Sequence, residues 1–149
     1  MNPPLRTKQD VLAIKQALVD GTIDVISSDH APHTENEKDI EFERAEFGVT
    51  GLETELAVTI TELVNNNILD WPTLVRKMAL NPSRILGIDK GTLSKGADAD
   101  IVIVDPQKEF TVNKDYFLSK SKNSPFISRK LNGFLEYTIF QGKVYKWNS

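Results

Sequence analysis

The sequence predicts an α/β segment followed by a β-rich segment. Before residue 90, stretches with apolar residues at helical spacing flank a short β-branched stretch, and after residue 90 β-branched and aromatic stretches dominate. The 149 residues are 40% hydrophobic and 26% charged, which is ordinary for a globular protein with one modest core. We therefore expect two structural units that meet near residue 88.

The first two expected helices are marked by capping residues. Thr7 and Asp10 have the spacing of a capping box, and Gly21 ends the helix that they begin. Residues 50–53, Thr-Gly-Leu-Glu, have the same spacing and precede an apolar stripe. That stripe consists of Leu52, Leu56, Ile60 and Leu63.

Further elements follow in order. A helix is expected over residues 70–79, and a separate helical turn from Asn81-Pro82 to Gly87. Residues 99–105 and 109–112 are expected as strands, and residues 135–147 as a hairpin that turns at Gln141-Gly142.

The β-branched stretch 22–28 is predicted to be a buried strand that ends at a polar cluster, Asp29-His30-Ala31-Pro32-His33-Thr34. A strand, a polar loop and a helix form the unit of a (β/α) barrel, whose catalytic groups lie at the carboxyl ends of strands. A complete barrel takes about 250 residues, so the chain is expected to be the last part of a barrel. Residues 35–46 hold six acids and two bases and are expected to form a surface loop or a mobile flap.

Charge and cysteine content exclude several classes of function. The chain has 18 basic and 21 acidic residues, a formal net charge of -3, so we expect no nucleic-acid partner. Without cysteines it has no disulfide and no thiolate metal site. No stretch approaches the roughly 20 apolar residues of a membrane span, so the expected location is cytoplasmic, with no membrane partner.

The only two histidines, His30 and His33, lie within four residues of each other and beside Asp29. Such clustering is typical of a metal or acid/base site, although an Asx-type turn with exposed histidines gives the same pattern. We expect this cluster alone to fall short of a catalytic zinc site, which takes three or four protein ligands. Two other sites are equally ambiguous: Asn2 lies in a loop stiffened by prolines, and Phe47-Gly48 is either a hinge or a close approach of backbone to a ligand.

Several motifs occur together in order. They are Asn2-Pro3-Pro4-Leu5-Arg6, Ser28 to Thr34, Phe47-Gly48-Val49-Thr50-Gly51-Leu52-Glu53, Asn81 to Gly87, and Gly96 to Val102. Together they resemble the dihydroorotases of the amidohydrolase superfamily, of the longer bacterial type, over nearly the whole chain. The resemblance implies the last segments of a TIM-type (β/α)8 barrel in residues 1–88. It also implies that residues 89–149 are the C-terminal part of a composite β-sandwich, so that the fold is incomplete.

The resemblance further implies a function and a set of roles. The reaction would be the reversible cyclisation of N-carbamoyl-L-aspartate to L-dihydroorotate in de novo pyrimidine biosynthesis, with binuclear Zn2+ whose other ligands lie outside this chain. Asp29 would be a zinc ligand and the general acid/base. Asn2, His33 and the Phe47-Gly48 backbone would hold the substrate. Arg6 and His30 match the motif as well, but no ligand role is carried over for them, and His30 is expected to support the loop rather than to contact a zinc.

Other interpretations stay open at this point. Allantoinases and hydantoinases share the barrel and an aspartate followed by histidine, and a non-catalytic dihydroorotase-like subunit would keep the fold. The isolated chain, as a fragment, is expected to be inactive. A homo-oligomer is compatible with the sequence, because the open strands of an incomplete barrel have to be paired, covered or swapped.

Overall fold

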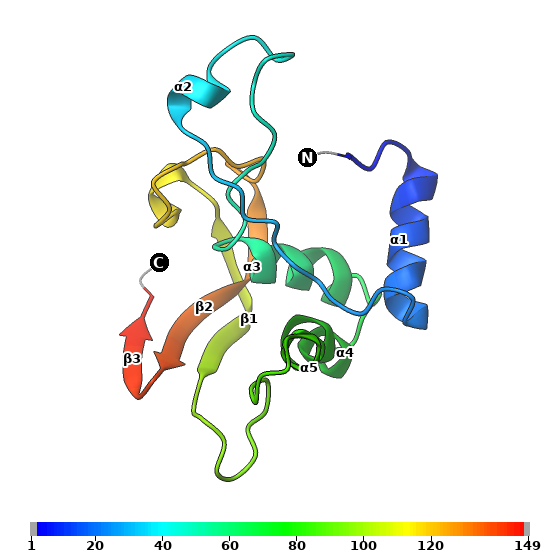
Figure 1. The fold of residues 1–149 in the computed structure, drawn as a ribbon, viewed down its shortest axis with the longest axis vertical. Helices are drawn as coiled ribbons and strands as arrows, with labels where there is room; N and C mark the ends of the chain where they lie inside the picture. Colours follow the sequence, from blue (N-terminus) through cyan, green and yellow to red (C-terminus); the bar gives the residue numbers. More distant parts are fainter. Residues whose placement is uncertain (1–2, 148–149) are drawn as a thin grey trace.

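A three-stranded antiparallel sheet, in the order β1-β2-β3, is covered on one side by helices (Figure 1). The chain is seen in a computed structural model that describes residues 3–147, so the expected site residue Asn2 lies outside the described residues. The strands are β1 (Ile101–Thr111), β2 (Lys130–Phe140) and β3 (Lys143–Lys146). Strands β2 and β3 form the predicted hairpin, and its turn residues Gln141 and Gly142 have φ of 49° and 74°. Two left-handed residues match the twist of the strands they connect.

The two strands predicted at 99–105 and 109–112 are one strand, whose register against β2 shifts at two places, the first between Ile103 and Val104. The register of β1 against β2 shifts between Asp105 and Glu109, where Pro106 has no N–H to donate. The Asp105 carboxylate accepts hydrogen bonds from the backbone N–H groups of Gln107 (3.0 Å) and Lys108 (3.1 Å). This local bulge keeps the chain within one strand, so the predicted break was wrong.

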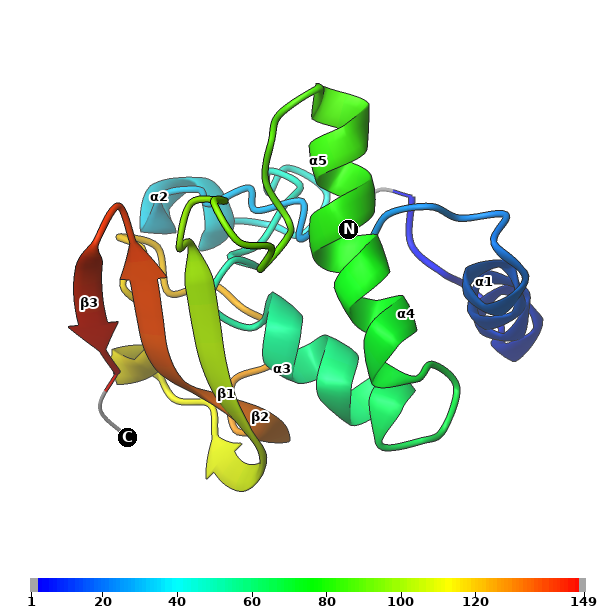
Figure 2. The same cartoon turned by 90° about the horizontal axis from the view of Figure 1, so that it is seen from below.

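Helix α1 (Lys8–Asp20) begins and ends as predicted. The Thr7 N–H donates to the Asp10 carboxylate (2.8 Å) and the Asp10 N–H donates to Thr7 Oγ1 (3.1 Å), while Gly21 ends the helix with φ 87°. Leu18 is buried. Figure 2 shows that the helix lies at the edge of the molecule, away from the sheet.

The helices predicted at 70–79 and 81–87 run together without a break. They are α4 (Trp71–Val75), the π-helical turn η2 (Arg76–Leu80) and α5 (Asn81–Leu86). The Asn81 N–H donates to the carbonyl of Arg76, five residues back. Widening the helix at this point accommodates Pro82, which has no N–H, so the predicted interruption was wrong. Gly87, at φ 66°, ends the helix as predicted.

The capping box predicted at 50–53 is absent. Thr50 is fully buried, and its N–H and hydroxyl both donate to the carbonyl of Asn123 at 3.0 Å. Glu53 Oε1 accepts the N–H of Ser119 at 2.8 Å. Helix α3 (Glu55–Thr59) therefore begins later than predicted, and it continues as the π-helical turn η1 (Ile60–Val64). Of the predicted stripe, Ile60 and Leu63 are buried but Leu52 is exposed.

Residues 22–28 do not form the predicted strand. A barrel strand pairs with a strand on each side, and within residues 3–147 this stretch has no such partner. It is attached to the long helix instead: the Ile26 N–H donates to the carbonyl of Lys77 (3.1 Å), and the Asn81 amide donates to the carbonyl of Asp24 (2.8 Å). The expected loop 35–46 contains one helical turn, α2 (Glu35–Lys38), and most of its residues are exposed.

The α3–η1 helix packs against β2. Gly133 has φ 93°, a conformation that residues with a side chain rarely adopt, and a Cβ added there would lie 3.3 Å from Ile60 Cβ, so glycine is favoured at this contact. The main core beside it consists of Ala57, Val112, Phe117 and Leu131. In the described part of the chain, no helix is long and apolar enough to cross a membrane.

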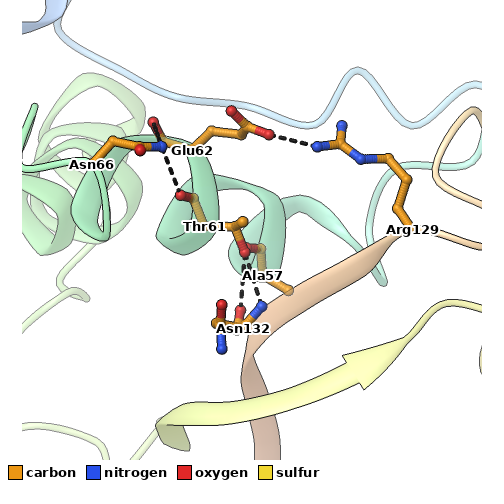
Figure 3. A network of polar contacts seen from close by, with 6 residues as sticks. All are labelled: Ala57, Thr61, Glu62, Asn66, Arg129 and Asn132. Atoms are coloured by element: carbon orange, nitrogen blue, oxygen red, sulfur yellow. Dashed lines mark hydrogen bonds and ion pairs between the residues drawn. The ribbon is translucent and has the colours of Figure 1, made fainter.

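Polar contacts reinforce the same junction (Figure 3). The Asn132 N–H donates to Thr61 Oγ1 at 2.9 Å, and that hydroxyl donates to the carbonyl of Ala57 at 2.8 Å. Arg129 pairs with Glu62 at 2.6 Å. These contacts join segments on either side of residue 88, and the division into domains 1–88 and 89–149 stays a prediction.

Candidate functional site

Two of the singled-out segments lie side by side. The Ala31 N–H donates to the carbonyl of Val49 at 3.0 Å, and His30 and Val49 form an isolated parallel bridge. Residues 29–34 thus run beside residues 47–51, and the chain between them projects outward (Figure 1). The structure therefore brings together two stretches that the sequence singled out separately.

His30 connects these stretches through its side chain. Its Nδ1 accepts the backbone N–H groups of Gly51 (3.1 Å) and Leu52 (3.2 Å). A nitrogen that accepts two N–H groups carries no proton of its own, so the neutral ring has its proton on Nε2. His30 supports the loop, in agreement with the sequence-based expectation.

Gly48 lies close to Ala31 and His33 in the loop of residues 29–34. Its φ is 115°, and an added Cβ would lie 2.7 Å from both Cβ and the carbonyl oxygen of Ala31 and 3.4 Å from His33 Cδ2. Both the conformation and the space require glycine. Phe47 beside it has an exposed fraction of 65%. The close approach seen at Gly48 is to another segment of the chain, and the approach of its backbone to a ligand stays a prediction.

Two residues that the sequence analysis did not single out hold this loop. The Lys38 ammonium donates to the carbonyl of Gly48 at 3.0 Å. The Glu37 carboxylate accepts the backbone N–H and the hydroxyl of Thr34, both at 2.8 Å, and lies 3.7 Å from His33 Nδ1. Those two hydrogen bonds from Thr34, followed by the attraction of His33, lower the pKa of Glu37. Lys38 has two backbone carbonyls, those of Glu46 and Gly48, as its partners, so no pairing of charges in the sequence could indicate its role.

Asp29 directly follows residues 22–28, the stretch that the sequence predicts to be a strand. Its φ is 46°, in the left-handed region, and its side chain is exposed. Aspartate tolerates this region better than most residues, although the conformation still costs about 1–2 kcal/mol. The carboxylate is therefore presented to solvent from a fixed and uncommon backbone geometry.

A second connection runs from this site to the segment between strands β1 and β2. Tyr116 donates its hydroxyl hydrogen to the carbonyl of Glu53 at 3.1 Å, and burial followed by the nearby Glu53 charge raises the pKa of Tyr116. Glu53 Oε2 is buried without a hydrogen-bond partner. A cavity of about 780 Å³ lies here, lined by residues that include His30, Glu53, Tyr116 and Trp147.

The described residues do not form a metal centre by themselves. Within residues 3–147, no three His, Asp or Glu side chains are grouped so that they could hold a metal ion. A catalytic zinc needs at least three protein ligands. The donor set of the described residues does not fit a complete zinc site.

Comparison with known proteins places this geometry in a family. Residues 3–145 match the amidohydrolase family. Curated dihydroorotases from Geotalea daltonii and Geobacter metallireducens are 55% and 54% identical over 144 residues, which cover 97% of this chain and 34% of each relative. The chain thus spans about a third of the length of these relatives.

Solved structures agree with this assignment. An L-hydantoinase (dihydropyrimidinase) from Arthrobacter aurescens matches with a TM-score of 0.89 and 34% identity, over 95% of this chain and 33% of that one. A D-hydantoinase (dihydropyrimidinase) from Thermus sp. matches with a TM-score of 0.87 and 28% identity, over 97% and 32%. They confirm the predicted fold class, an incomplete α/β part of a TIM-type barrel protein. The chain belongs to the amidohydrolase family.

Proposed function

We propose that the protein containing this chain is a dihydroorotase, which interconverts N-carbamoyl-L-aspartate and L-dihydroorotate in de novo pyrimidine biosynthesis. The observation that carries the proposal is the identity of 55% with a curated dihydroorotase across 97% of the chain. The hydantoinase of known structure from Arthrobacter aurescens is 34% identical. The proposed partner is a small molecule, with neither nucleic acid nor membrane, and the proposed location is cytoplasmic.

Asp29 is proposed as the general acid/base. In the hydrolytic direction, a carboxylate takes a proton from the attacking water as oxygen bonds to the ring carbonyl carbon. The same group returns that proton to the ring nitrogen as the carbon–nitrogen bond breaks. An exposed carboxylate on a constrained backbone suits both steps. The reverse direction uses the same group with the proton moving the opposite way.

His33, the Phe47-Gly48 backbone and Asn2 are proposed to hold the substrate. A neutral or charged imidazole donates a hydrogen bond to a carboxylate, and an amide side chain donates as well. Supporting this, Gly48 approaches His33 Cδ2 so closely that an added Cβ would be 3.4 Å from it. A group bound by His33 would therefore lie beside the Gly48 backbone.

The cofactor in this proposal is zinc. The family is in general metal-dependent. Asp29 would be one ligand. The other ligands would have to come from outside residues 3–147, because these residues contain no group of three His, Asp or Glu side chains that could hold a metal ion. Apart from this one ligand, the proposal gives the residues of this chain only the proton transfer and the substrate contacts described above.

A hydantoinase-type activity is the second candidate, favoured by the TM-score of 0.89 with an L-hydantoinase. The test is to assay the full-length protein with L-dihydroorotate, hydantoin and allantoin, and to separate the products by chromatography. We expect turnover of dihydroorotate and formation of it from N-carbamoyl-L-aspartate. Preference for hydantoin or allantoin would refute the dihydroorotase proposal, and no turnover of any substrate by the folded, metal-loaded protein would favour a non-catalytic subunit. Asp29→Asn is the control for activity from contaminants.

A further inference from the structure

We propose that His30 is a positioning residue that fixes the conformation of Asp29 for catalysis. This inference rests on the proposed role of Asp29 as the acid/base. His30 itself touches no reacting atom in this proposal. It acts by attaching the backbone on the carboxyl side of Asp29 to the turn before helix α3.

Asp29 adopts a backbone conformation that needs outside support. Its φ of 46° is unfavourable for a residue with a side chain, and such conformations persist where the surrounding structure enforces them. Because the side chain is exposed, packing around the carboxylate cannot enforce it. The support must come through the residues on either side.

Those neighbours are both held by the same short stretch, residues 49–52. On the carboxyl side, His30 Nδ1 accepts the N–H groups of Gly51 and Leu52, and the Ala31 N–H donates to the carbonyl of Val49. On the amino side, the Gly51 backbone lies against Ser28, because a Cβ added at Gly51 would be 2.7 Å from the Ser28 carbonyl oxygen. The residues before and after Asp29 are therefore both held in place by residues 49–52.

The chemistry of the contact tells which substitutions preserve it. His30 contributes one acceptor, at the ring atom nearest the backbone, and it faces two donors at 3.1 and 3.2 Å. The Oδ1 of asparagine lies the same number of bonds from Cα and also accepts two hydrogen bonds. The Oε1 of glutamine lies one bond farther out. Asparagine should replace the contact, and glutamine should not.

The experiment compares His30→Ala, His30→Asn and His30→Gln in the full-length enzyme. Because misplacement by about 1 Å costs on the order of 10²-fold in rate, His30→Ala should lower kcat by about that factor with little change in KM. His30→Asn should recover most of kcat, and His30→Gln should stay near His30→Ala. Hydrogen exchange at Gly51 and Leu52 should be faster in the alanine and glutamine variants and slow again in the asparagine variant.

A spectroscopic measurement tests the conformation of Asp29 without any activity. The Asp29 Cα and Cβ chemical shifts, which depend on φ, should move in His30→Ala and return in His30→Asn. Unchanged shifts in His30→Ala, a rise in KM at constant kcat, or asparagine restoring slow exchange but not kcat would each overturn the proposal. If wild-type protein fails to convert dihydroorotate, the proposed function fails, and the exchange and shift measurements still decide whether His30 holds Asp29.

Discussion

Replacing Gly48 by alanine adds one methyl group at the contact between the two site loops. The new Cβ would lie 2.7 Å from both Cβ and the carbonyl oxygen of Ala31. Van der Waals contacts between carbon atoms begin at about 3.5 Å, so the two loops must separate by about 1 Å. Holding alanine at φ 115° adds backbone strain of about 1–3 kcal/mol, and overpacking typically adds about 1–3 kcal/mol more.

Because Ala31 is two residues from Asp29, we expect the displacement to reach the proposed acid/base. A shift of about 1 Å should lower kcat/KM by on the order of 10²-fold. Gly21→Ala is the matched control, since Gly21 has φ 87° and nothing within 4 Å of its added Cβ. It carries similar strain without the clash, so it should destabilise the protein while leaving the activity of the folded fraction unchanged.

The assay measures kcat/KM of the full-length enzyme with L-dihydroorotate, together with urea unfolding of each variant. Adding Ala31→Gly to Gly48→Ala removes one of the two clashes at 2.7 Å and leaves the carbonyl contact, so we expect partial recovery. Normal kcat/KM in a folded Gly48→Ala variant would refute the reasoning. An equal loss of activity in Gly21→Ala would show that strain, rather than loop separation, is responsible.

Asp29→Asn in the full-length enzyme should lower kcat by about 10²- to 10⁴-fold without unfolding it; near-normal turnover would remove Asp29 from the mechanism. His33→Ala should raise KM and slow turnover while zinc content, measured by atomic absorption, stays the same; loss of zinc would identify His33 as a ligand instead. The lowered pKa of Glu37 means that its bonds to Thr34 stabilise the turn above the unfolded pKa and that this stability is lost as pH falls through the lower folded pKa. The Thr34 amide resonance should therefore titrate below the unperturbed value of 4.5 and stay constant in Glu37→Gln, whose amide oxygen still accepts. The isolated chain, purified in zinc and dialysed, should retain no stoichiometric zinc and show no turnover, and about one tightly bound zinc per chain with activity would contradict the fragment interpretation.

Capping and turn residues in the sequence correctly identified those elements whose stabilising contacts join residues close together in the chain. Thr7 and Asp10 cap a helix three residues apart, and Gln141-Gly142 turns a hairpin, so short-range chemistry was sufficient in both cases. The same signal misled at Thr50. Its hydroxyl can cap a helix or reach a distant carbonyl, and its partner Asn123 is 73 residues away. A capping pattern does not show which of the two contacts the fold will form.

The candidate site also contains features that the sequence indicates and contacts that it does not indicate. Clustered polar residues after a β-branched stretch were enough to single out Asp29, His30 and His33 as candidates, because titratable side chains are visible in the sequence itself; their roles stay predictions. The groups that hold them act on backbone atoms: Lys38 binds a carbonyl, and His30 accepts two amides. Backbone donors and acceptors are the same at every residue, so no composition or spacing in the sequence distinguishes the ones that are used.

Residues 22–28, which do not form the predicted strand, show that such backbone contacts can fix the geometry of a loop. A parallel strand is stable between neighbouring strands, and within residues 3–147 this stretch has none. Nevertheless the residues at its carboxyl end keep a defined geometry, because Ala31 and His30 are bound to Val49 and the turn that follows it. The loop that presents Asp29 is therefore held by the segment leading into α3, and does not depend on a sheet within this part of the chain. This is why we expect substitutions at Gly48 and His30, which leave every proposed proton-transfer group chemically unchanged but move it, to affect the rate.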